Sequence, residues 1–288
     1  MHHHNFYYGQ QHILARYCGL DDEFPPRIPG YLQHGWNVGC GWNPVHEFFD
    51  GAWRYVWSDA PRRRGHSLGR RNYAVTGAPM LYLMDLEPDL GKVPDASRSV
   101  TLWFLFHGWD APGMGAKIHG DHARLISEIK ETETEPVTIS LYYTEYERAE
   151  VRRSYEEAGF EVICFGKRGW NYEGTDRQFL YKQLKAFRRF KRVASNRLAT
   201  AIFYGVAAGC EPAVYGDPMH LEREDLATAE RIRRQWPELH GRHPESEPAR
   251  RSALAELGDG YLASPAELRA MLGWTPDRLA AERVAVPA

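Results

Sequence analysis

A regular alternation of apolar runs and amphipathic segments between residues 137 and 216 constrains the fold more than any other feature of the sequence. Short apolar runs, which predict strands, occupy 137–143, 160–166, 192–194 and 212–216. Helical spacing of apolar residues fills the segments between them, at 145–158, 178–190 and 196–208. Because strands that alternate with helices form parallel sheets with right-handed crossovers, this part predicts a Rossmann-like α/β fold.

The part of the chain before residue 134 is less regular. Aromatic-rich runs separated by turn clusters predict strands at 29–34, 53–57, 79–85 and 99–106, and a helix is expected at 121–131. The polar segment KETETEP, residues 130–136, is typical of a linker. We therefore predict two domains, a reduced and loop-rich α/β domain at 1–133 and a Rossmann-like domain with C-terminal helices at 134–288. Those last helices are expected at 222–236 and, capped by Ser264, up to Gly273, with a loop rich in His, Pro and Glu between them.

Composition excludes several classes of protein. A chain of 288 residues suits one large or two compact domains, and its formal charge of -2 provides no general attraction for nucleic acid. The four cysteines form no CxxC pair, which argues against a disulfide framework or a structural zinc site and fits a reducing cytoplasm. We expect no signal peptide and no transmembrane segment, while peripheral association with a membrane stays open.

The common catalytic and nucleotide-binding motifs are missing. The sequence has no GxxxxGK[ST] loop, no GxGxxG after a strand, no HExxH and no GxSxG. The segment IHGDH, residues 118–122, brings three potential metal ligands together, but a helix cap at Asp121 explains it better. We therefore expect no metal site and no cofactor.

The pair Ser195-Asn196 is the first candidate for binding a ligand. It lies where a predicted strand ends and a helix begins, so backbone N–H groups there are available to a phosphate, and Thr200 follows one turn later. The alternative is that Ser195 only caps the helix. Lys167 and Arg168 follow another strand and supply positive charge for a diphosphate, or else belong to a solvated loop.

The tripeptide His-Gly-Trp occurs twice, each time after an apolar run, at residues 34–36 and 107–109. An imidazole in such a loop can act as a base at neutral pH, so His34 is either a catalytic base or a histidine that ends a strand. The tyrosines of LYYTEYE, residues 141–147, either stack on a base or sugar or belong to the core.

The residues from 135 to 217 resemble the donor half of bacterial GT-B glycosyltransferases that build capsular and other surface polysaccharides. The resemblance rests on the runs EPVTISLYYTEYERAEVRRSYEEAGFEVICFGKR and FLYKQLKAFRRFKRVASNRLATAIFYGVAAGCEPAVYG. It implies two Rossmann-like halves with parallel sheets and a cleft between them, with residues 1–133 as the acceptor side. YLQHGW, residues 31–36, is similar to a histidine-glycine loop in the acceptor half of some of these enzymes.

The resemblance also implies roles for individual residues. His34 corresponds to the catalytic base. The contacts to the donor and its phosphates correspond to Ser195, Asn196, Arg197, Thr200, Gly166, Lys167 and Arg168. Candidate contacts to the acceptor or sugar are Trp36, His107, Trp109 and Tyr143.

The sequence therefore predicts a metal-independent, cytoplasmic glycosyltransferase. It would transfer a sugar from a nucleotide-activated donor to a hydroxyl of a saccharide or small molecule, in the biosynthesis of bacterial polysaccharides or glycoconjugates. The donor is a substrate, and no nucleic acid is expected as a partner. The alternatives are a nucleotide-sugar hydrolase or epimerase on the same fold and a non-catalytic carbohydrate- or nucleotide-binding protein.

Overall fold

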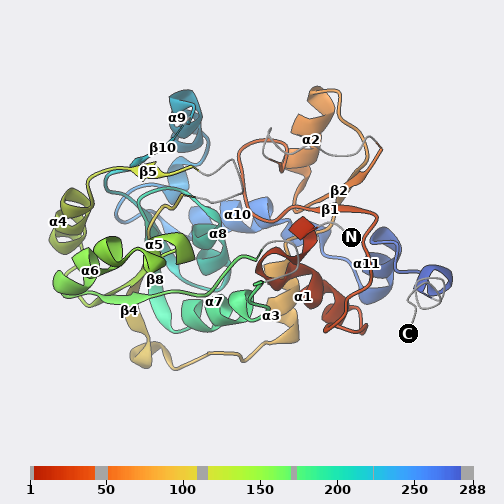
Figure 1. The fold of residues 1–288 in the computed structure, drawn as a ribbon, viewed down its shortest axis with the longest axis horizontal. Helices are drawn as coiled ribbons and strands as arrows, with labels where there is room; N and C mark the ends of the chain where they lie inside the picture. Colours follow the sequence, from red (N-terminus) through yellow and green to blue (C-terminus); the bar gives the residue numbers. More distant parts are fainter. Residues whose placement is uncertain (1–2, 43–50, 109–115, 170–173, 223, 280–288) are drawn as a thin grey trace. The chain divides into compact units, whose positions relative to one another are not determined.

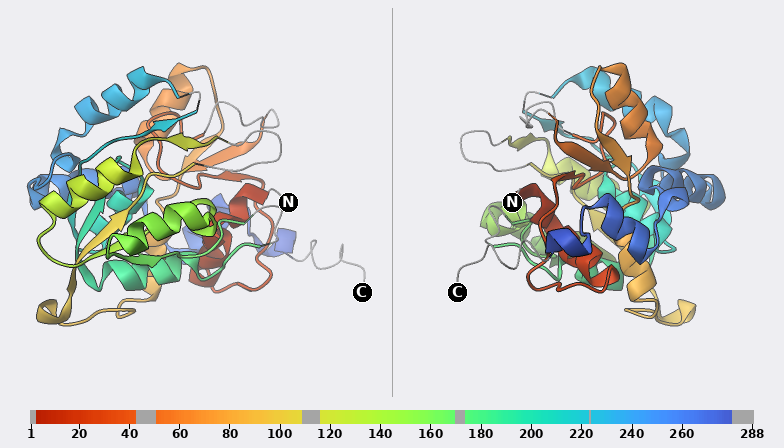
Figure 2. Two further views of the ribbon diagram at one scale, coloured as in Figure 1. Left: turned by 60° about the vertical axis from the view of Figure 1, so that its left-hand side comes forward. Right: turned by 90° about the vertical axis from the view of Figure 1, so that its right-hand side faces the viewer.

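The computed structural model describes residues 3–42, 51–108, 116–169, 174–222 and 224–279 (Figures 1 and 2). The chain divides into two compact units, and both are discontinuous in sequence. Unit 1 comprises residues 1–88, 167–181 and 254–288, and unit 2 comprises residues 89–166 and 182–253. Among the described residues, none of the helices combines the length and the apolar character needed to cross a membrane.

Unit 2 is built on a parallel sheet of five strands. In chain order the strands are β4 (Ser99–Phe104), β6 (Val137–Ser140), β7 (Glu161–Ile163), β8 (Phe190–Ser195) and β9 (Glu211–Val214). Their order in the sheet is β7-β6-β4-β8-β9, so the chain winds outward in one direction from β4 and then in the other from β8. This arrangement confirms the predicted parallel sheet, and it puts a topological switch point between β4 and β8.

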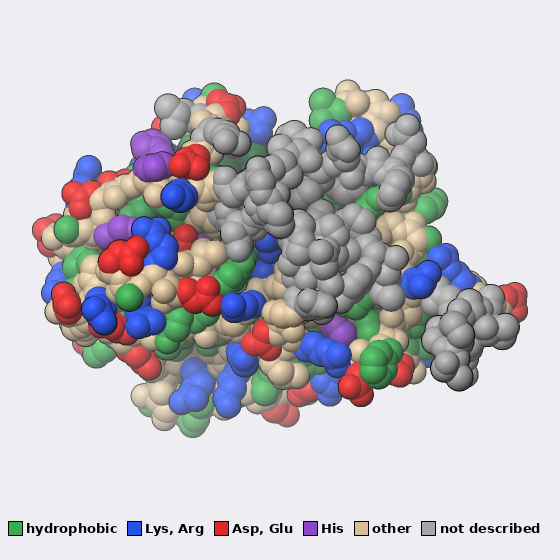
Figure 3. Space-filling model, viewed as in Figure 1, with side chains coloured by type: hydrophobic (Ala, Val, Ile, Leu, Met, Phe, Trp, Pro, Cys, Tyr) green, Lys and Arg blue, Asp and Glu red, His purple; other side chains and the backbone are tan. Residues whose placement is uncertain are grey.

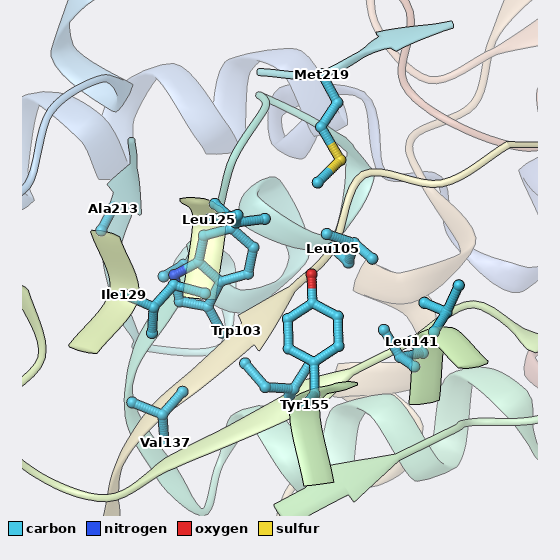
Figure 4. Close-up of a cluster of buried hydrophobic side chains, with 12 residues drawn as sticks. Trp103, Leu105, Leu125, Ile129, Val137, Leu141, Tyr155, Ala213 and Met219 are labelled. Atoms are coloured by element: carbon cyan, nitrogen blue, oxygen red, sulfur yellow. The ribbon is translucent and has the colours of Figure 1, made fainter. Parts of the chain in front are cut away.

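Alternation of side chains along the strands gives unit 2 two apolar faces. On one face Trp103 of β4 and Ile139 of β6 pack with Leu125 and Ile129 of α4 (His122–Thr132) and Tyr155 of α6 (Ala149–Glu157) (Figure 4). On the other face Phe104 contacts Phe187 of α7 (Phe179–Phe187), with ring centroids 5.7 Å apart. Helix α8 (Thr200–Ala207) packs on β8 of the same sheet.

The remaining elements of unit 2 are short or lie after β9. They are η2 (Asp95–Ser97), β5 (Ile118–His119), α5 (Tyr143–Glu147), β10 (His220–Leu221), α9 (Leu226–Gln235), η3 (Pro237–Leu239) and most of α10 (Ser246–Leu257). β5 and β10 pair antiparallel. The expected cap at Asp121 is confirmed, because its carboxylate accepts a hydrogen bond from the backbone N–H of Arg124 at 3.0 Å.

Unit 1 contains a second, smaller parallel sheet, in the order β1-β2-β3. Its strands are β1 (Gly30–Leu32), β2 (Trp53–Val56) and β3 (Tyr73–Val75), and α2 (Asp59–Ser67) connects the last two. Its other elements are η1 (His3–Gly9), α1 (Gln10–Tyr17), α3 (Pro79–Leu86), η4 (Asp259–Tyr261) and α11 (Pro265–Met271). A parallel sheet in each unit confirms the predicted α/β class.

Three expectations about local structure are wrong. The apolar run at 79–85 is α3 and not a strand: Pro79 occupies its first turn, and residues 79–83 are all buried, so they show no alternation that separates strand from helix. The helix expected from Asn196 begins at Thr200, so Ser195 ends β8 and is not its cap. The segment rich in His, Pro and Glu, expected as a loop, contains α10.

The division into units also differs from the predicted boundary between residues 133 and 134. β4 precedes that boundary but pairs with β6 and β8, which follow it. Glu133, in the expected linker, has only 4% of its side chain exposed and forms an ion pair with Arg192 at 3.4 Å. Its carboxylate also accepts hydrogen bonds from Thr101 and Tyr215, both at 2.7 Å. These buried contacts fix the Glu133 side chain in the interior of unit 2.

Candidate functional site

The centre of the candidate site in unit 2 is Asn196, immediately after the carboxyl end of β8. Its side chain is buried and accepts a hydrogen bond from the backbone N–H of Phe106, just beyond β4, at 2.8 Å. Its amide nitrogen donates to the backbone carbonyl of Asp217, in the loop after β9, at 2.9 Å. Asn196 thus fixes three loops at the switch point, where open parallel sheets bind their ligands.

An aromatic row lies on the β6 side of this point. The ring of His107 stacks on Tyr142 with centroids 4.0 Å apart, and Tyr142 contacts Tyr143 at 4.7 Å. Buried Glu145 accepts a hydrogen bond from the backbone N–H of Gly108 at 3.0 Å, which holds the loop after His107. His107 and Tyr143, two of the predicted sugar contacts, therefore belong to one structural group.

Arg197 follows Asn196 directly in the loop after β8. Its guanidinium is 4.1 Å from the centre of the Phe106 ring and forms a two-pronged ion pair with Glu224. The two side chains are only 10% and 13% exposed. Burial alone would raise the pKa of Glu224, but the hydrogen bond and charge of Arg197 outweigh it and leave that pKa below its ordinary value.

A pocket of about 260 Å³ opens beside Arg197 in unit 2. The loops after β8 and β9, helix α9 and residues 240–242 form its walls. Three of its lining residues are arginines, Arg197, Arg233 and Arg242, against one acid, Glu230. The volume is slightly below the range of roughly 300–1,000 Å³ that holds a whole drug-sized ligand, so the pocket suits one part of a larger anionic molecule.

His240 also lines this pocket. Burial lowers the pKa of its imidazole, and the nearby Arg233 lowers it further, whereas the hydrogen bond with the backbone carbonyl of Trp236 opposes the shift. This shift favours the neutral imidazole, so His240 adds little positive charge to the pocket at pH 7.

The two hydroxyls predicted at the phosphate site differ in position. Ser195 is buried at the end of β8, and its oxygen accepts a hydrogen bond from the backbone N–H of Arg197 at 3.3 Å. Thr200 is half-buried at the first position of α8. The loop from Ser195 to Thr200 thus carries all four predicted phosphate contacts of this region in unit 2, including Asn196 and Arg197.

The second group of predicted site residues lies in unit 1, around His34. His34 follows the carboxyl end of β1, and its backbone carbonyl accepts a hydrogen bond from the side chain of buried Gln10 at 2.9 Å. The imidazole meets the ring of Tyr7 edge to face, with centroids 5.3 Å apart. The guanidinium of Arg168 lies 4.6 Å from the centre of the same ring.

Buried hydrogen bonds fix the loop that carries His34. Gln33, 1% exposed, donates to the carbonyl of Gly35 at 3.0 Å and accepts from the backbone N–H of Trp57 at 3.1 Å. The indole of Trp36 donates to Glu256 at 2.8 Å. The backbone around His34 is therefore preorganised.

The predicted donor residues after β7 divide between the units. Gly166 belongs to unit 2, whereas Lys167 and Arg168 belong to unit 1. Trp109 lies outside the described residues. Among the residues that the structure describes, no three or more His, Cys, Asp or Glu side chains are grouped to hold a metal ion.

Sequence reasoning missed several residues of these groups. Glu224 pairs with a side chain 27 positions away, and no local pattern indicates that pairing. Gln10 likewise reaches the His34 region from a distant segment, and the sequence indicated Arg168 as a donor contact but not its position over Tyr7. The tyrosine pair at 142 and 143 did carry a signal, because it follows directly on a predicted strand.

The fold and these groups define an α/β protein with a candidate anion-binding site at the switch point of its larger parallel sheet. No protein-family model matches the chain. No curated protein matches it either.

Two solved structures show weak similarity to the chain. One is HepE from Anabaena, in complex with UDP and glucose, at 12% identity and a TM-score of 0.31 over 81% of this chain and 63% of that one. The other is the wall teichoic acid polymerase TagF, at 10% identity and a TM-score of 0.29 over 81% of this chain and 56% of that one. The chain thus spans less than two thirds of either structure.

Proposed function

We propose that the protein is a glycosyltransferase of GT-B type that binds the nucleotide part of an activated sugar at the β4/β8 switch point. The observation that carries this proposal is the position of Asn196, whose buried amide joins the loops after β4, β8 and β9. The sequence resemblance of residues 135–217 supports the same assignment. The acceptor would be a hydroxyl of a saccharide or small molecule, and the transfer would need no metal.

In this proposal the loop after β8 binds the phosphates. Arg197 supplies the charge that stabilises the departing nucleotide, with hydrogen bonds from Ser195 and Thr200. Gly166, Lys167 and Arg168 stay proposed donor contacts. The pocket beside Arg197, with its excess of arginines, would hold the base or ribose of the donor. A buried, fixed arrangement of this kind favours the transition state because its dipoles are already oriented.

His34 is the proposed base. Its imidazole would take the proton of the acceptor hydroxyl while that oxygen forms a bond to the anomeric carbon. The bond between the anomeric carbon and the phosphate oxygen breaks, and the nucleotide leaves with the electron pair. The edge-to-face contact with Tyr7 and the hydrogen bond from Gln10 hold the residue in one orientation. Trp36, His107, Trp109 and Tyr143 stay proposed contacts for the sugar or acceptor.

Nucleotide binding is the first test. The protein is titrated calorimetrically with CMP, CDP, UDP, GDP and TDP, and one of them should bind selectively. Arg197→Gln should weaken that nucleotide at least tenfold, because a charge-assisted contact to phosphate is lost. Arg250→Gln, at an exposed position of α10, is the matched control and should bind like the native protein. If none of the five nucleotides binds, the proposal fails.

Turnover is the second test. With the donor class known, sugar transfer is followed by release of free nucleotide in the presence of candidate acceptors. His34→Asn should abolish transfer and leave nucleotide affinity unchanged. Release of free sugar without any acceptor would instead indicate a hydrolase, and an isomerised donor would indicate an epimerase. Binding without any turnover would indicate a non-catalytic binding protein.

A further inference from the structure

One segment of unit 1 is much more basic than the rest of the chain. Residues 51–75 contain six arginines and a single aspartate, although the whole chain has a formal charge of -2. Asp59 pairs with Arg62 and Arg63 at the start of α2, so it offsets charge only at that end of the helix. Arg70 and Arg71 lie beyond the other end of α2, and residues 60–75 contain no Asp or Glu to offset their charge.

The segment between α2 and β3 meets the start of β2 at one edge of the unit 1 sheet. The backbone N–H of Arg54 donates to the carbonyl of Asn72 at 2.7 Å, and the guanidinium of Arg54 donates to the carbonyl of Arg71 at 3.1 Å. This is the edge at which the parallel strands begin. His34 follows the other, carboxyl end of β1, so this surface is separate from the His34 loop.

Two large apolar side chains are exposed in the segments that meet at this edge. Leu68, in the turn after α2, is 66% exposed, and Trp53, at the start of β2, is 45% exposed. Arginines follow each of them within three residues. In the space-filling view, blue and green side chains lie together over α2 (Figure 3, upper right). Exposed apolar side chains beside arginines suit a partner that is both anionic and apolar.

We propose that this amino-edge surface, formed by Trp53, Arg54, Leu68, Arg70 and Arg71, docks the protein on an anionic lipid bilayer. Arginines at a membrane surface are attracted to acidic headgroups. Tryptophan is favoured at the boundary between headgroups and acyl chains, and leucine inserts into the apolar layer. Nucleic acid would use the arginines but would leave Leu68 without a contact, so the bilayer accounts for more of the surface.

The test measures sedimentation of the full chain with vesicles of phosphatidylcholine alone or mixed with phosphatidylglycerol. The protein should bind only the mixed vesicles, and salt should weaken the binding. Arg71→Glu should reduce the partition coefficient roughly 30-fold, since each basic side chain near an anionic surface contributes about a fivefold factor. Arg70 is left unchanged because its guanidinium also donates to the sulfur of Cys40 at 2.7 Å.

Two matched variants control for charge and apolarity. Arg250→Glu makes the same change of charge on α10, and Phe24→Ser removes another exposed apolar side chain, 74% exposed, in a different loop. Both should bind vesicles like the native protein, whereas Leu68→Ser should bind roughly tenfold more weakly. Thermal melts verify that every variant is folded.

Three results would overturn the proposal. The first is no preference for the acidic vesicles, and the second is equal loss of binding in the control variants. The third is tight binding to double-stranded DNA with a particular response to the two variants. Arg71→Glu would abolish this DNA binding, whereas Leu68→Ser would leave both DNA binding and vesicle binding intact. That pattern would identify a polyanion site instead of a membrane surface. Nucleotide affinity is measured on the same variants, so that a failure of membrane docking is distinguishable from a failure of the proposed glycosyltransferase function.

Discussion

The side chain of Asn196 accepts a hydrogen bond from the backbone N–H of Phe106 at 2.8 Å, and this contact joins segments 90 positions apart. The same amide donates to the carbonyl of Asp217. One buried side chain therefore sets the spacing of three loops at the carboxyl edge of the unit 2 sheet. A ligand at that edge would meet a geometry that exists before it binds.

Replacing Asn196 should reduce the stability of the protein. Asn196→Ala leaves the N–H of Phe106 and the carbonyl of Asp217 without this partner, and a buried polar group that loses its hydrogen bond costs about 1–3 kcal/mol. Urea unfolding should show a lower free energy of unfolding by that amount or more. Ser127→Ala, which removes an exposed hydroxyl on α4, should change it by less than about 0.5 kcal/mol. Equal stability of the two variants would contradict this assignment.

The ion pair between Arg197 and Glu224 should make a pH-dependent contribution to stability. The folded pKa of Glu224 lies below its unfolded value, so the contribution is complete above the unfolded pKa of about 4.3 and is lost as the pH falls through the folded pKa. Glu224→Gln should therefore be less stable than the native protein by about 1–3 kcal/mol at pH 7, as for a charged hydrogen bond.

Below about pH 4 the difference between native protein and Glu224→Gln should shrink. Denaturant unfolding at several pH values measures it. Glu247→Gln provides a control, because its ion pair with Arg251 is 67% exposed on both sides and should contribute about 0–1 kcal/mol. A difference for Glu224→Gln that is independent of pH would rule out the ion pair as its cause.

Three histidines with a lowered pKa, buried His12 and half-buried His122 and His240, should make the protein sensitive to mild acid. Burial lowers the pKa of His12, His122 and His240 below the ordinary value of 6.5. The unfolded chain therefore binds protons near pH 6 that the folded chain does not, and stability rises with pH in that window. The melting temperature should fall as the pH drops from 7.5 towards 5.5. His122→Gln should reduce this dependence, and an unchanged slope would show that His122 does not contribute.

Gly205 should tolerate no side chain, although it lies within a helix. A Cβ there would lie 2.7 Å from a methyl group of Val193, so α8 and β8 would have to separate. Gly205→Ala should lower the free energy of unfolding by about 1–3 kcal/mol, the usual cost of overpacking, despite the better helix propensity of alanine. Gly260→Ala has open space around it and should have little effect. Greater stability of Gly205→Ala would refute the close packing.

The sequence predicted unit 2 better than unit 1, for a physical reason. The strands at β6, β8 and β9 carry apolar runs bounded by turn residues, and the Asp121 cap has a local signature that the structure confirms. By contrast, residues 79–83 of α3 are all buried and Asp85 is the one charged residue of the helix, so its sequence has too little of a polar face to reveal a helical period. The start of α8 at Thr200 follows a loop that is fixed by the hydrogen bond between Asn196 and the distant Phe106. No local propensity encodes that contact.

The candidate site was predictable only in part for a similar reason. The loop after β8 could be found because ligands gather at the carboxyl ends of parallel strands. The pairing of Arg197 with Glu224 and the contact of Arg168 with Tyr7 are tertiary contacts between distant segments. Such contacts follow from the complete fold and not from any window of sequence.

The discontinuous makeup of unit 1 has a consequence for synthesis on the ribosome. Its first segment ends at Pro88, but its last segment begins only at Leu254, after all of unit 2. Unit 2 can therefore complete its contacts while unit 1 still waits for its final helices. The order in which the two units become finished is then the reverse of the order in which they are begun. During that interval the N-terminal segment must avoid aggregation while part of its buried surface has no partner.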